Sequence, residues 1–184
     1  RGGGGAGGAR YGAGEGGVRG WGEGRDGRGR AVGVGGVEDG LASGGICRGQ
    51  QLINVARDGG GLQDGDGHRQ EAGREAETHP VAVEPGSDLA EVLGERVDVN
   101  TFHHQVVDPE RIGRGLKVSA FRADGERFIE GLESADGKIH AVPWNPEDMT
   151  DREGSRRTFR PLVEPGTART PPPSRGGLHP PGAP

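Results

Sequence analysis

Apolar residues are sparse in the first 45 positions and recur with helical spacing in two later segments. Residues 48–57 carry Leu52, Val55 and Ala56 on one face and are followed by three glycines, which predicts a helix that ends there. Residues 87–93 start at a serine suited to the N-cap and carry a short apolar stripe. The pattern therefore predicts one amphipathic helix near position 50 and a shorter one near position 90.

Four later segments alternate apolar and polar residues or form short apolar runs, as strands do. They are residues 97–102, 116–121, 128–132 and 139–144. Turn pairs of aspartate and glycine separate the last three of them, at 124–125 and 136–137. We expect these strands to join the two helices in a mostly parallel α/β sheet.

The rest of the chain lacks such periods. Residues 1–45 are glycine interleaved with charged residues and predict loop or disorder, and residues 58–80 predict a polar surface loop. A weak apolar face predicts a closing helix over 152–163. The expected organisation is a Gly-rich part at 1–45, an α/β domain at 46–164 and a disordered Pro-rich tail at 165–184.

Composition narrows the function classes. The chain has 184 residues, 40 of them glycine and 13 proline, and only 29% are hydrophobic. A net charge of −5 argues against a nucleic-acid partner for the whole molecule, and no apolar run is long enough to span a membrane. One cysteine excludes an internal disulfide, so we expect a cytoplasmic protein. Because the first residue is Arg1, we also expect the chain to be a fragment.

The single cysteine, Cys47, lies between Gly45 and Gly49 at the start of the first predicted helix. A strand, a sharp turn at the cysteine and a following helix would form a nucleophile elbow, in which the helix N-terminus faces the sulfur. Such a thiol is expected to ionise near neutral pH. The alternative is a small buried apolar residue in a Gly-rich loop. The local pattern leaves both interpretations open.

Three separated segments together resemble class I glutamine amidotransferase-like hydrolases, specifically the gamma-glutamyl-gamma-aminobutyrate hydrolase type. They are GICRGQQLINVA at 45–56, VNTFHHQVVD at 99–108 and AVPWNPE at 141–147. Their order and spacing agree with the family's elbow, its V-N-S-F-H-H-Q-A-V-D segment and its G-V-Q-W-H-P-E segment. The resemblance extends over about residues 45–163.

A fainter match places residues 1–12 at the family's P-G-G-G-D-V-D-P-x-x-Y-G segment. The resemblance implies a partial flavodoxin-like α/β domain of the class I amidotransferase type. If the faint match holds, the N-terminal strands of the family's sheet are missing from this chain.

The resemblance also implies a chemistry. Cys47 would attack a gamma-glutamyl amide with water as the final acceptor, and Glu147 would orient a histidine that moves the proton. The Arg48 N–H, with that of Gly3 or Gly4, would stabilise the oxyanion. The loop near the glutamyl end of this small-molecule substrate would contain His103, His104 and Gln105. No cofactor and no metal are implied, and the amine released and the oligomeric state are not readable.

Asn145 stands at the position of the family's histidine. An amide has no nitrogen that titrates near neutral pH, so we expect hydrolysis to be impaired. Three alternatives remain open. One of His103 and His104 replaces the missing base; the chain is a remnant that binds gamma-glutamyl compounds or a partner without turnover; or the Gly/Arg-rich start binds RNA.

Overall fold

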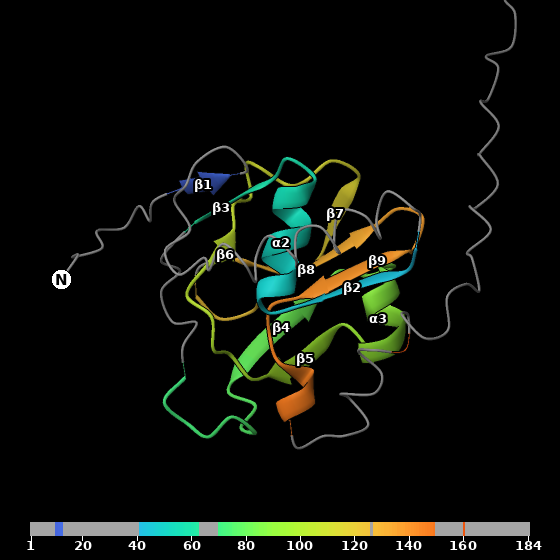
Figure 1. Cartoon of the computed structure of the whole chain (residues 1–184). Coiled ribbons are helices and arrows are strands. Elements are labelled where there is room, and N and C mark those ends of the chain that lie inside the picture. The colour runs from blue at the N-terminus through green and yellow to red at the C-terminus, as the bar shows by residue number, and fades with distance from the viewer. Residues whose placement is uncertain (1–9, 13–40, 63–69, 126, 150–159, 161–184) are drawn as a thin grey trace, which may run out of the picture.

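The structure, a computed structural model, describes residues 10–12, 41–62, 70–125, 127–149 and 160. Nine strands form one mixed sheet, with few helices (Figure 1). The strands are β1 (Arg10–Gly12), β2 (Ser43–Ile46), β3 (Gly60–Leu62), β4 (His79–Val83), β5 (Arg96–Val99), β6 (Val106–Val107), β7 (Leu116–Arg122), β8 (Ile129–Ser134) and β9 (Ile139–Val142). The helices are α2 (Arg48–Ala56), α3 (Asp88–Leu93) and the 3-10 turn η1 (Pro146–Asp148). No helix in these described ranges is long and apolar enough to cross a bilayer.

Neighbouring strands follow the order β1-β3-β6-β8-β7-β4-β5, and β9 pairs with β8 and with β2. Every pairing is antiparallel except that of β2 with β9. The expectation of a mostly parallel sheet is therefore wrong. Short glycine turns connect β7 to β8 and β8 to β9, and such turns reverse the chain, which produces antiparallel neighbours.

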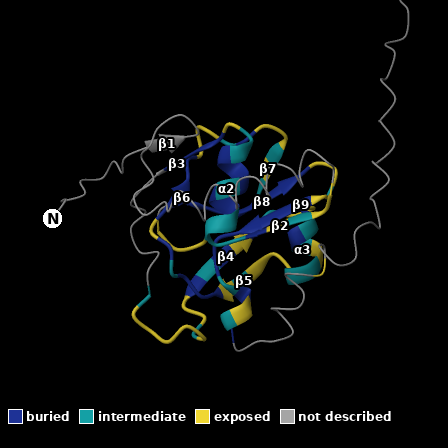
Figure 2. Ribbon diagram, viewed as in Figure 1, coloured by how far each residue is buried: buried dark blue, intermediate teal, exposed yellow. Residues whose placement is uncertain are grey.

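Two apolar clusters hold the helices onto the sheet. Ile53 of α2 packs with Ala141 and other residues of β6, β8 and β9, whereas Leu89 of α3 packs with Val142 and residues of β4, β5 and β7. Consecutive residues of a strand point to opposite faces, so α2 and α3 cover opposite faces of the sheet. Figure 2 shows buried residues filling the central strands β8 and β9.

The predicted helices and most predicted strands are confirmed, with shifted ends. The Ser87 hydroxyl accepts a hydrogen bond from Ala90 N (3.0 Å), and Gly94 ends α3 with φ 81°. Strands β5, β7, β8 and β9 lie in the four predicted segments.

The polar loop predicted for residues 58–80 is wrong at both ends, because β3 occupies Gly60–Leu62 and β4 begins at His79. Pairing with distant strands stabilises these two segments, whose own glycine and proline content disfavours a strand. The closing helix predicted at 152–163 lies outside the described residues apart from Arg160. The loop predicted for 1–45 is described only at β1 and from Leu41 onward.

The close approach of α2 to β2 depends on Gly45. A Cβ on Gly45 would lie 2.7 Å from Gly49 C and 2.7 Å from Ile53 Cδ1, whereas a Cβ on Gly49 would meet nothing within 4 Å. Of the two glycines that flank the elbow, only Gly45 is required by lack of space.

We predict that Gly45→Ala lowers the free energy of unfolding by about 1–3 kcal/mol, because the added methyl group overpacks the contact between helix and strand. Gly49→Ala is the matched control and should be neutral or slightly stabilising, because alanine favours helix. Urea denaturation of both variants measures the difference. Equal destabilisation by the two substitutions would contradict this account of the elbow.

Candidate active site

Cys47 makes the sharp turn between β2 and α2. Its backbone has φ 52° and ψ −113°, a conformation that residues other than glycine adopt rarely and at a cost of about 1–3 kcal/mol. Cys47 N donates to Val142 O of β9 (2.9 Å), and Cys47 O accepts from Gln50 N (3.1 Å). The thiol is thereby held at the N-terminus of α2, in the predicted strand, turn and helix arrangement.

Burial raises the pKa of the Cys47 thiol above its usual value. The negative charge of Glu147 adds to this rise, whereas the Arg48 N–H and the positive charges of Arg74 and Arg48 oppose it. The net effect is upward, so the thiol is protonated at neutral pH. The expected neutral-pH thiolate is therefore wrong for this chain, because the desolvation cost exceeds the help from the helix N-terminus.

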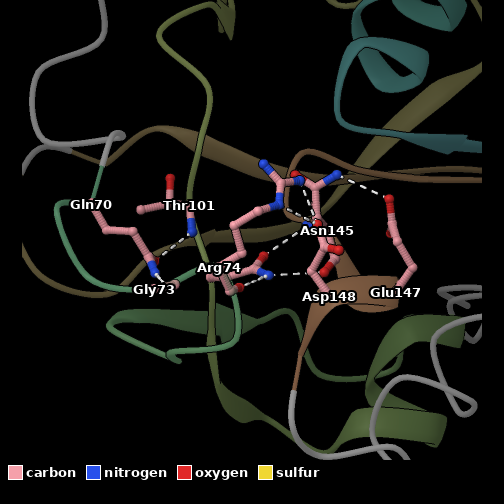
Figure 3. A network of polar contacts seen from close by, with 8 residues as sticks. Gln70, Gly73, Arg74, Thr101, Asn145, Glu147 and Asp148 are labelled. Atoms are coloured by element: carbon pink, nitrogen blue, oxygen red, sulfur yellow. Dashed lines mark hydrogen bonds and ion pairs between the residues drawn. The ribbon is translucent and has the colours of Figure 1, made fainter.

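The segment that follows β9 lies beside the elbow, since β2 and β9 run parallel and end at the same edge. In η1, Glu147 is exposed, and its Oε1 accepts a hydrogen bond from Asn145 Nδ2 (3.1 Å, Figure 3). The structure thus brings together Cys47, Asn145 and Glu147, three residues predicted to share one site. The contact between Asn145 and Glu147 orients the amide but supplies no proton acceptor that works near neutral pH.

Asn100 is a site residue that the sequence reasoning missed. Its side chain is fully buried, its Oδ1 accepts from Asn145 N (2.8 Å) and its Nδ2 donates to Asn145 O (2.9 Å). The same Nδ2 donates to Arg74 O (2.8 Å). One amide therefore fixes the backbone at Asn145 and ties it to the segment 70–78. The only signal in the sequence was the asparagine within the VNTFHHQ segment.

Arg74 was also missed, because it lies in the segment predicted as a featureless loop. Its guanidinium pairs with Asp148 and lies over the Phe102 ring, 4.9 Å from the centroid (Figure 3). Nearby, Gln70 bonds the Thr101 backbone at both its N–H and its C=O. Residues 70–74 are thus bound to the loop after β5, and the Arg74 charge acts on the Cys47 thiol.

His103 and His104 have opposite environments. His103 is buried, with Nδ1 3.0 Å from Gln105 O, whereas His104 is exposed. Gln105 is buried, and its carbonyl oxygen also accepts from Gln51 Nε2 of α2 (3.0 Å). His103 therefore anchors the loop to the elbow helix. These contacts do not support the idea that His103 replaces the missing base.

A fully buried carboxylate supports this loop from below. Glu130 of β8 has no exposed surface, and its two oxygens lie 3.1 Å from His79 Nε2 and 4.0 Å from His103 Nε2. A buried carboxylate is stable only when hydrogen bonds or opposite charge compensate the lost hydration. The two imidazoles flanking Glu130 provide such compensation and connect β4, β8 and the His103 loop.

Among the expected oxyanion donors, the Arg48 N–H lies at the N-terminus of α2 beside the sulfur, where it lowers the thiol pKa. Gly3 and Gly4 lie outside the described residues. Half of the expected oxyanion hole is thus in place at the elbow.

A cysteine at a strained strand-to-helix turn, with a carboxylate after the parallel neighbouring strand, is the arrangement of class I glutamine amidotransferase-like proteins. Residues 36–147 match the family model described as Peptidase C26, and the chain belongs to this family.

Relatives and solved structures agree with the assignment. A Mycobacterium tuberculosis protein named "Putative glutamine amidotransferase" is 41% identical over 139 residues, 71% of this chain and 42% of that protein. A Schizosaccharomyces pombe protein of the same name is 38% identical over 116 residues, 59% of this chain and 44% of that protein. The chain thus spans less than half the length of these relatives.

Two crystal structures share the fold at low sequence identity. One is of a putative GMP synthase protein from Thermoplasma acidophilum, with TM-score 0.53, 18% identity, and 71% of this chain and 62% of the other covered. The other is of a glutamine amidotransferase from Thermotoga maritima, with TM-score 0.50, 15% identity, and 73% and 50% covered.

We predict that iodoacetamide alkylates Cys47 slowly at neutral pH and that the rate keeps rising into the alkaline range, because the raised pKa keeps the sulfur protonated. Glu147→Gln should shift the profile to lower pH, since it removes a negative charge that raises the thiol pKa. Intact-protein mass spectrometry follows the reaction at this single cysteine. A rate that is already at its plateau at neutral pH would show that the thiol is ionised there.

We predict that Glu130→Ala lowers the free energy of unfolding by about 3–5 kcal/mol, because it removes the buried partner of two imidazoles. Glu95→Ala, at an exposed carboxylate, is the control and should change stability by less than about 0.5 kcal/mol. Chemical denaturation compares the two. Similar stabilities for both variants would mean that the Glu130 contacts contribute little.

Proposed function

We propose that this chain has a site of the gamma-glutamyl amide hydrolase type, with Cys47 at the nucleophile position, and that hydrolysis is impaired because Asn145 cannot act as a base. The observation that carries the proposal is the Asn145 amide bonded to Glu147 beside the elbow. A carboxylate in this place orients the group that transfers the proton. In this chain the oriented group is an amide.

The chemical consequence follows step by step. Attack on a gamma-glutamyl amide requires the Cys47 thiol to lose its proton, and burial and Glu147 both oppose that loss. The tetrahedral intermediate would meet the Arg48 N–H at the N-terminus of α2. Its collapse requires a proton on the departing amine, and hydrolysis of the resulting thioester requires a base for water. Asn145 supplies neither proton transfer.

The remaining scaffold favours ligand binding as the second function. The His103–Gln105 loop is fixed by Gln51 from α2 and by Glu130 from below, independently of any proton transfer. The loop at 70–74 is fixed by Asn100 and by the Thr101 backbone. A site held in this way can bind a gamma-glutamyl compound without turning it over.

We predict that the native chain hydrolyses a gamma-glutamyl anilide slowly or not at all and that Asn145→His raises the rate by about 10²–10⁴-fold, the usual contribution of a general base. A chromogenic anilide assay measures the rate. Asn145→Ala controls for loss of the contact with Glu147 and should give no gain. Cys47→Ser in the Asn145→His background should abolish the gain.

Two outcomes would contradict the proposal. The first is turnover by the native chain that depends on Cys47 and equals that of Asn145→His. The second is a folded Asn145→His protein, checked by circular dichroism, that shows no turnover and whose Cys47 gains no protection from alkylation by gamma-glutamyl compounds.

A further inference from the structure

Three side chains capable of binding a metal meet where α3 approaches the β8–β9 hairpin. Asp88 is the first residue of α3, and Glu133 and His140 are directly paired across β8 and β9. One nitrogen or oxygen atom from each lies within 4.8 Å of those of the other two. No other such group of three or more occurs in the ranges that the structure describes. The proposed hydrolase site uses none of the three.

The burial of this cluster distinguishes it from an ordinary acidic surface. Glu133 is 0% exposed and His140 is 7% exposed, while Asp88 remains partly open to solvent. Glu133 accepts hydrogen bonds from the backbone N–H groups of Asp88 (3.2 Å) and Leu89 (3.4 Å). These bonds leave further lone pairs on its two oxygens, so a metal ion would share the carboxylate without displacing them.

The charge of the cluster favours a further cation. Two carboxylates face one ammonium group, since Lys117 Nζ lies 2.8 Å from Glu133 Oε1. The Lys117 side chain is half exposed on a flexible stem, so it can turn out into water. Lys117 therefore acts as a resident cation that competes with a metal ion for Glu133.

The third ligand is an imidazole with spare bonding capacity. His140 Nε2 lies 2.9 Å from Gly137 O and 3.8 Å from Asp88 Oδ2, while its Nδ1 is buried without a hydrogen-bond partner. The turn containing Gly137 lies against Asp88, because a Cβ on Gly137 would be 3.1 Å from Asp88 Oδ2. The Gly137 carbonyl thus adds a fourth oxygen beside the cluster.

We propose that Asp88, Glu133 and His140 form a binding site for a divalent zinc ion, which would tie the start of α3 to the β8–β9 hairpin. One imidazole nitrogen and two carboxylates are a ligand set that suits zinc, with the fourth position open to water or to the Gly137 carbonyl. Magnesium prefers six oxygen ligands in an octahedron and fits this set poorly. His140, read from the sequence as an ordinary strand residue, is assigned here as a ligand.

The test is calorimetric titration of the full chain with zinc chloride, in the native protein and in Cys47→Ser, which removes the thiol as a competing ligand. We expect one zinc ion per chain at this site in both proteins, little binding of magnesium, and a zinc-dependent rise in the melting temperature. His140→Asn should weaken zinc affinity by about 100-fold or more, since the loss of outer partners alone costs about 10–100-fold.

Two further variants sharpen the result. Lys117→Met should strengthen zinc binding, because it removes the competing cation, whereas the exposed-histidine control His104→Asn should leave the affinity unchanged. Glu133→Gln should abolish binding, and if that variant does not fold, His140→Asn and Lys117→Met still decide. Zinc affinity that is insensitive to His140→Asn, weaker binding by Lys117→Met, or no zinc binding by the native chain would overturn the proposal.

Discussion

The parallel pairing of β2 with β9 is the constraint on which the candidate site depends. The register joins Ile46 to Val142, and Cys47 N extends the ladder by donating to Val142 O. Because parallel strands end at the same edge, the turn after β2 and the segment after β9 meet there, which brings Cys47 close to Asn145 and Glu147. All other strand pairs are antiparallel and build the body on which this one pair rests.

Buried polar groups fix the geometry around that edge, and they do so without requiring catalysis. Asn100 holds the Asn145 backbone and the 70–74 loop, while Glu130 holds the loop of His103 from beneath. Such groups are costly to leave unsatisfied, so they select one arrangement of the loops. The scaffold of a Peptidase C26 site is therefore retained in a chain whose proposed proton-transfer position holds an amide.

Local signals predicted the parts of the fold that local physics determines. The Ser87 cap, the helix after Cys47 and the four later strands were visible because capping and periodicity act within a few residues. Strand β4 was not predicted, since Pro80 disfavours a strand and only pairing with β5 and β7 stabilises it. Arg74 and Asn100 join the site through contacts distant in sequence, and the thiol pKa depends on burial that no motif encodes.

The central claim is that the elbow is assembled and the base is absent. The most direct measurement is the intact mass of the protein after incubation with a gamma-glutamyl anilide and rapid acid quenching. The account predicts an unmodified native chain and, in Asn145→His, a gamma-glutamyl thioester on Cys47. A thioester that accumulates on the native chain as fast as on Asn145→His would contradict it.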